Sequence, residues 1–203
     1  MLRIWFSLAL FIAVDSDVAT AITNRQWFNV WQKVDGTCMN QRHWFLKETS
    51  QVPVTFKTEA GYKVLSGRWQ DSYTDAQYDQ AADISIDHIL SLGYAKRHGA
   101  KAWTDAERKR FGSDTDNLAI SATKDNQQKS DLSPDKWMPP VGRKGCWYVA
   151  QWWYVAKKYN LEVEESIWQS IMNKLQTCTP GETRTPDHLV RSQGLYPTEL
   201  RAQ

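Results

Sequence analysis

An acid and a histidine stand side by side near the end of a short apolar stretch, residues 84–90. Apolar and polar side chains alternate in the first half of this stretch, a pattern that predicts a β-strand. The carboxylate of Asp87 can hold a hard cation, and a neutral imidazole at His88 can take a proton from water near pH 7. Adjacent strand residues point to opposite faces, so we expect a bulge or bend at the strand end to bring both groups to one site.

Further polar groups follow along the chain. Asn117 precedes a predicted second strand, residues 118–122, and Asn126 lies on a predicted helix that begins at residue 123 or 124 and ends near residue 130. Lys129 comes three residues after Asn126, so both side chains share one face of that helix. The local order is therefore strand, strand, helix, with polar groups on or beside each element.

These groups suit the hydrolysis of a phosphodiester bond, which needs a nucleophile and stabilisation of charge on the phosphate and the leaving oxygen. Asp87 and Asn126 would be oxygen ligands of one divalent cation, and His88 would be the general base. Asn117 would hold the loop of the base by hydrogen bonds, and Lys129 would hold a substrate phosphate. Oxygen ligands favour Mg²⁺ or Mn²⁺ over Zn²⁺.

Each of these residues also has a structural interpretation. His88 is then a buried, hydrogen-bonded core histidine. Asn117 is then the cap of a turn, Asn126 a solvated helix residue, and Lys129 a surface lysine. The structure has to decide between the two interpretations for each residue.

Other aromatic and histidine side chains are expected to be structural. A tryptophan cluster, Trp147, Trp152 and Trp153, is suited to stacking on bases, but such clusters are more often core, and core is the expectation here. His43 and His98 are expected to be structural or exposed.

Several short motifs stand in a fixed order: Ser66-Gly67-Arg68-Trp69, Ile86-Asp87-His88, Asp116-Asn117-Leu118, Asn126-x-x-Lys129-x-Asp131 and Trp137-Met138-Pro139-Pro140. The set resembles the HNH, or ββα-metal, nucleases and is most similar to the C-terminal domain of GmrSD-type restriction enzymes, over about residues 27–178. The resemblance implies an α+β fold with a ββα-metal core, surrounding helices and a C-terminal antiparallel helix pair. It also implies metal binding by Asp87 and Asn126, activation of water by His88, and orientation of the base by Asn117.

The sequence departs from this family at two positions. Ser91 stands where the family often has a proline, three residues after the histidine. Lys63 stands where the family often has a cysteine that pairs with the counterpart of Cys38. Neither departure removes a catalytic group, but the second leaves Cys38 without a partner.

Two helices are predicted in the last structured part, over residues 146–159 and 164–177, because apolar side chains recur at helical spacing. Cys146 begins the first helix and Cys178 follows the second. Antiparallel packing would bring these ends together, so we expect a Cys146–Cys178 disulfide. The chain has three cysteines, an odd number, which leaves one over.

The remaining elements are assigned from local patterns. They are helical structure over residues 22–48, strands over 52–56 and 62–65 with a break at Ser66-Gly67, a polar loop over 72–82, and short helices over 93–98 and 104–111.

The two ends of the chain differ from the part between them. Arg3, an apolar run over residues 4–14 and the small-residue pattern Ala19-Thr20-Ala21 predict a signal peptide over residues 1–21. An N-terminal core helix is the alternative. Cleavage would leave a mature chain that starts at Ile22.

The domain prediction follows from these boundaries. Residues 22–178 form the predicted HNH nuclease domain. Residues 179–203 have no helical or strand period, resemble read-through of a neighbouring tRNA gene, and are expected to be disordered.

The combined prediction is a secreted or periplasmic metal-dependent endonuclease. The net charge is +2, so charge alone predicts no partner; we expect nucleic acid, DNA rather than RNA, a monomer, and no stable membrane association after signal cleavage. The alternatives are a catalytically inactive exported binding module on an HNH scaffold and a phosphodiesterase for small phosphoesters.

Overall fold

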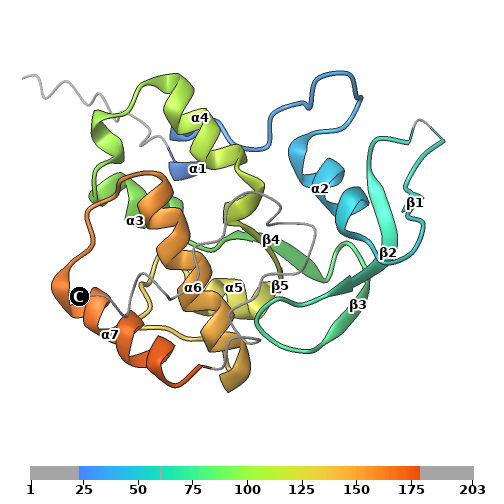
Figure 1. The fold of residues 1–203 in the computed structure, drawn as a ribbon. Coiled ribbons are helices and arrows are strands. Elements are labelled where there is room, and N and C mark those ends of the chain that lie inside the picture. The colour runs from blue at the N-terminus through green and yellow to red at the C-terminus, as the bar shows by residue number, and fades with distance from the viewer. Residues whose placement is uncertain (1–22, 60, 179–203) are drawn as a thin grey trace, which may run out of the picture.

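The chain folds into two small antiparallel β-sheets with helices packed around them (Figure 1). The computed structural model describes residues 23–59 and 61–178. The arrangement confirms the predicted α+β class. The predicted signal peptide, residues 1–21, and the predicted disordered tail, residues 179–203, lie outside the described residues.

One sheet has the strand order β1 (Thr55–Phe56), β2 (Val64–Gln70) and β3 (Gln77–Gln80). Helix α2 (Gln41–Thr49) packs on β2. The fully buried Trp69 fixes this packing, because its indole N–H donates to a carbonyl of α2 at 2.8 Å.

Two sequence predictions are wrong in this sheet. Strand β2 continues through Gly67, where the sequence predicts a break. A Cβ at Gly67 would lie 2.6 Å from Ser50 Oγ and 2.7 Å from the Trp69 ring, so the glycine marks a close approach within the strand. Strand β3 forms inside the predicted loop 72–82 because its backbone pairs with β2, although its side chains are mostly exposed and show no apolar alternation.

The second sheet pairs β4 (Ile84–His88) with β5 (Leu118–Ala122) in one antiparallel register without a shift. Helix α5 (Thr123–Lys129) follows β5 at once and packs on both strands. The predicted order of strand, strand and helix is therefore confirmed. A bend at Ile89 and Leu90 follows β4, where the sequence predicts either a bulge or a bend.

The C-terminal helices are α6 (Gly142–Lys158) and α7 (Glu165–Gln176), which pack together. The predicted disulfide between Cys146, in the first turns of α6, and Cys178, just beyond α7, is confirmed. Cys38 is exposed and free, as expected for the third cysteine.

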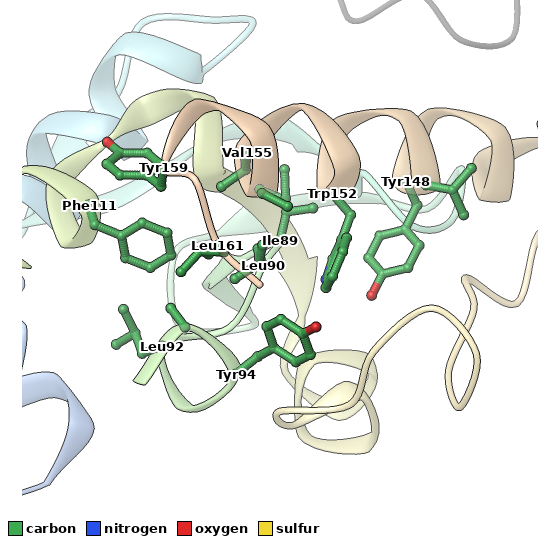
Figure 2. Close-up of a cluster of buried hydrophobic side chains, with 14 of the residues drawn as sticks. Ile89, Leu90, Leu92, Tyr94, Phe111, Tyr148, Trp152, Val155, Tyr159 and Leu161 are labelled. Atoms are coloured by element: carbon green, nitrogen blue, oxygen red, sulfur yellow. The ribbon is translucent and has the colours of Figure 1, made fainter. Parts of the chain in front are cut away.

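The largest core lies between α6 and the bend after β4 (Figure 2). Trp152 and Val155 of α6 come together there with Ile89 and Leu90. Because interiors are close-packed, this contact gives the end of β4 one defined position. The core interpretation of the tryptophan cluster is confirmed, since its members are buried or partly buried in this core: Trp147, Trp152 and Trp153.

The N-terminal part is less helical than predicted. Helix α1 (Asn24–Trp27) has one turn, and the next helix begins only at Gln41. Between them, Asn29 and Trp31 have φ of 51° and 64°, a left-handed conformation that no α-helix can continue. This segment returns to the core through Phe28, which is fully buried.

Helices α3 (Leu92–Arg97) and α4 (Asp105–Ser113) occupy the predicted positions, with short 3-10 turns η1 (Ala100–Ala102) and η2 (Thr115–Asn117) beside them. The two histidines expected to be structural have packing or hydrogen-bonding roles. His98 stacks on a tyrosine ring at 3.9 Å, and His43 Nδ1 accepts from a backbone N–H of β2 at 3.2 Å: Tyr94 and Val64 are the partners.

Candidate active site

His88 ends β4, and its ring is held by one hydrogen bond. Nε2 lies 2.9 Å from the carbonyl oxygen of Gly112 in α4. Because a carbonyl only accepts, Nε2 carries the proton and Nδ1 keeps its lone pair. Burial lowers the pKa of His88 from 6.5 to about 4, so the ring is neutral at pH 7. A neutral imidazole in one tautomer is suited to accept a proton at Nδ1.

Asn117 fixes the bend that follows this histidine. Its Oδ1 accepts from the backbone N–H of Leu90 at 2.8 Å, and its Nδ2 donates to the Leu90 carbonyl at 3.0 Å. The side chain is fully buried. Asn117 therefore has the position expected of a residue that pins the loop, and it holds the backbone two residues after His88.

Asp87 and Lys129 form a buried ion pair. Lys129 Nζ lies 2.9 Å from Asp87 Oδ2 and donates to the His88 carbonyl at 2.9 Å, and its side chain is 0% exposed. An ammonium without exposed surface cannot touch a substrate, so the predicted role of Lys129 as a phosphate ligand is wrong. The surface-lysine alternative is wrong for the same reason. The physical cause is the carboxylate at the end of β4, which needs a counter-ion when it is buried.

Two residues that sequence patterns alone did not predict also support Asp87. The hydroxyl of the fully buried Tyr73 donates to Asp87 Oδ2 at 2.5 Å. Asp71 Oδ1 accepts from the N–H of Tyr73 at 2.7 Å, and its Oδ2 accepts from the N–H of Ala122, just before α5. The sequence Asp71-Ser72-Tyr73 could have indicated the first of these bonds, since an aspartate often accepts a hydrogen bond from the backbone N–H two residues further on.

Asp87, His88 and Asn126 line one surface hollow of about 330 Å³. Asn126 is half-buried on α5, and its side chain forms no hydrogen bond with any residue that the structure describes. The start of α3 and the N-terminal segment around Arg25 complete the rim. The three groups predicted for ligand and base roles are therefore brought to one place.

The serine at the departure from the family pattern begins a helix. Ser91 is the N-cap of α3, and its hydroxyl accepts from the N–H of Tyr94 at 3.0 Å. Serine is among the residues that favour this position. Serine in place of the family's proline therefore still fixes the start of α3 at the rim of the hollow, and Ser91 itself lines the hollow.

The donor set of the hollow fits one hard cation. Within residues 23–59 and 61–178, no group of three or more His, Cys, Asp or Glu side chains could hold a metal. Mg²⁺ does not need such a cage, since one or two carboxylates, water and substrate phosphate usually suffice. The carboxylate of Asp87 and the free amide oxygen of Asn126 meet that requirement, although a cation has to share Asp87 with Lys129.

Two antiparallel strands are followed by a helix, with a histidine and an aspartate at the strand end and asparagines on the following elements. The chain belongs to the family of GmrSD restriction endonucleases, C-terminal domain. The model of that family matches residues 45–171, which is more than half of the chain. The family match indicates a nuclease-type domain of the HNH class.

A further protein is also similar to this chain. It is described as an uncharacterized secreted protein from Arthroderma benhamiae, and it is 31% identical over 157 residues, 76% of this chain and 75% of the relative. The relative bears out the predicted secreted location. No solved structure matches the chain. None of the helices within the described residues has the length and apolar character needed to cross a membrane.

Proposed function

We propose that this protein is a secreted, metal-dependent endonuclease that hydrolyses phosphodiester bonds of nucleic acid. One observation carries the proposal. His88 is neutral, its Nε2 is tied to the Gly112 carbonyl, and it lines one hollow with Asp87 and Asn126. This is the combination of a proton acceptor and oxygen ligands that the reaction needs.

The residues have separate roles in this proposal. His88 takes a proton from the attacking water at Nδ1, while its Nε2–H stays on Gly112. Asn117 holds the backbone after His88, and Lys129 holds the His88 carbonyl. The ring is therefore held before substrate arrives, which removes reorganisation from the reaction.

Asp87 and Asn126 would hold the divalent cation, Mg²⁺ or Mn²⁺, which when bound supplies charge stabilisation at the phosphate and the leaving oxygen. Tyr73 and Lys129 keep the carboxylate of Asp87 in one orientation. The half-buried amide of Asn126 has no competing hydrogen bond among the described residues, which supports its role as a ligand.

The substrate and setting follow from the same reasoning. The family to which the chain belongs, and the secreted relative, support a nuclease that acts outside the cell. We propose DNA rather than RNA as its substrate, action as a monomer, and no stable membrane association after removal of residues 1–21.

A second candidate is an exported binding module that keeps the scaffold without catalysis. The observation that favours it is the engagement of both Asp87 oxygens by Lys129 and of one by Tyr73, because these contacts compete with a cation. A phosphodiesterase for small phosphoesters is the third, and it differs from an endonuclease only in the substrate that enters the hollow.

Plasmid cleavage with Mg²⁺ or Mn²⁺, with and without EDTA, separates these candidates. The wild-type protein should cut plasmid only without EDTA, and His88→Ala should cut at least about 10²-fold more slowly. His43→Ala is the matched control, since that histidine lies outside the hollow. Equal cutting by His88→Ala would refute the assignment of the base. Hydrolysis of a small phosphodiester without plasmid cleavage would favour the third candidate, and no hydrolysis of either would favour the second.

A further inference from the structure

The N-terminal segment, residues 24–31, forms one wall of the hollow although it precedes the matched family region, residues 45–171. Asn24, Arg25 and Trp31 line the hollow beside His88. The Trp31 ring lies 5.7 Å from the His88 ring, centroid to centroid. The hollow in this chain is therefore completed by residues that precede the region matched by the family model.

This wall lies close against α3 and α4 at two glycines. A Cβ at Gly112 would lie 2.5 Å from Val30 Cγ1 and 3.0 Å from the Phe28 carbonyl oxygen. A Cβ at Gly93 would lie 3.2 Å from Asn24 Nδ2. The contact at Gly112 leaves no room for a side chain, so the segment packs closely on α4, while the exposed Asn24 side chain approaches α3 at Gly93.

The backbone of Trp31 is strained where the N-terminal segment packs against the rest of the domain. Its φ of 64° is in the left-handed region, which a bulky residue rarely adopts. Such strain persists only where surrounding contacts impose it, and it clusters at functional sites. The ring of Trp31 packs on both hydrophobic clusters, which supply those contacts.

Arg25 is the cation that this wall brings to the hollow. Its side chain is exposed, and no described residue forms an ion pair or hydrogen bond with it. Two other cations beside the hollow are engaged, since Lys129 is buried against Asp87 and Arg97 pairs with Asp131 at 2.5 Å. The charge of Arg25 is close enough to contribute to the lowered pKa of His88.

We propose that Arg25 binds a backbone phosphate of the substrate, the role for which Lys129 is not available. A guanidinium presents paired N–H donors that match two phosphate oxygens. The inference rests on the proposed nuclease function, whose substrate carries such phosphates on both sides of the bond that is cut. It assigns substrate affinity to the N-terminal segment and proton transfer to β4.

Binding can be measured apart from cleavage. The probe is a fluorescein-labelled DNA duplex, titrated in EDTA with the full chain carrying His88→Ala, over about 50–200 mM salt. Adding Arg25→Ala should weaken binding and lower the slope of log K against log salt by about 0.9, the value for one lost phosphate contact on duplex DNA. Arg25→Lys should keep most of the slope, because the charge remains.

Arg68→Ala is the matched control. Arg68 lies on β2 outside the hollow and forms an exposed ion pair with Asp79, so its loss should leave affinity and slope unchanged. An Arg25→Ala variant that melts like its parent and keeps the affinity and slope of the Arg68→Ala variant would overturn the inference. If wild-type protein fails to cut plasmid while Arg25→Ala still loses the slope, the phosphate contact stands and the proposed catalysis falls.

Discussion

Replacement of Lys129 tests whether its ion pair with Asp87 is structural. Lys129→Ala leaves the carboxylate of Asp87 buried, with the Tyr73 hydroxyl as its remaining partner. Removing one member of a buried ion pair typically destabilises a protein by about 3–5 kcal/mol. Since a domain of this size shifts its Tm by about 2–4 °C per kcal/mol, the expected drop is about 6–20 °C.

The assay is thermal unfolding followed by circular dichroism at pH 7, with the disulfide intact. Lys124→Ala is the matched control, because Lys124 is exposed on the same helix, and it should change stability by no more than about 0.5 kcal/mol. A double variant, Asp87→Asn with Lys129→Met, should be more stable than Lys129→Met alone, since no charge is left without a partner.

A phosphate-binding lysine would give the opposite pattern. Lys129→Ala would then melt like Lys124→Ala and would lose affinity for DNA with a reduced salt slope. A loss below about 1 kcal/mol, the range of exposed ion pairs, would therefore refute the assignment of Lys129 as the structural partner of Asp87.

Three further predictions concern stability. The folded-state pKa of His88 is lowered to about 4, so the neutral ring contributes fully to the stability of the fold above its unfolded pKa of about 6.5, and this contribution is lost as pH falls towards 4. His88→Gln, measured in EDTA, should therefore lose roughly 3 kcal/mol less stability over this pH range than the wild type. Parallel curves of unfolding free energy against pH for the two proteins would refute the lowered pKa. Cys146→Ser with Cys178→Ser opens a loop with a sequence separation of 32 and should lower the free energy of urea unfolding by about 3–4 kcal/mol, whereas no change would show that the disulfide does not stabilise the fold. Tyr73→Phe keeps the buried ring but removes the donor to Asp87, so it should cost about 1.5–3 kcal/mol in the same urea assay, and a neutral result would mean that this hydrogen bond is not formed.

The elements that could be predicted from the sequence are those marked by patterns within a short stretch of the chain. Strand β4 alternates apolar and polar residues, and α5 follows β5 without a loop, so the order around the site could be predicted. Helix periodicity likewise placed Cys146 and Cys178 at neighbouring helix ends. These predictions depend on patterns within a few residues of each other.

The features that escaped prediction depend on contacts between distant segments. Lys129 looks like an exposed helix residue until α5 is packed against Asp87. Asp71 and Tyr73 lie in a polar stretch and gain their roles only from β4 and from the start of α5. Strand β3 has exposed side chains, so only its pairing with β2 reveals it.

The close contact between Val30 and Gly112 also has a consequence for the order in which the protein is made. During synthesis, Val30 leaves the ribosome long before Gly112. Gly112 has no side chain and so lets Val30 pack closely against it, and its carbonyl accepts the hydrogen bond of the His88 ring. Contacts between residues so distant in sequence form late, because a long loop must close first. A growing chain therefore exposes its N-terminal segment before it has a complete site. The proposed site can therefore be complete only after Gly112 has left the ribosome, when the N-terminal segment has long been outside it.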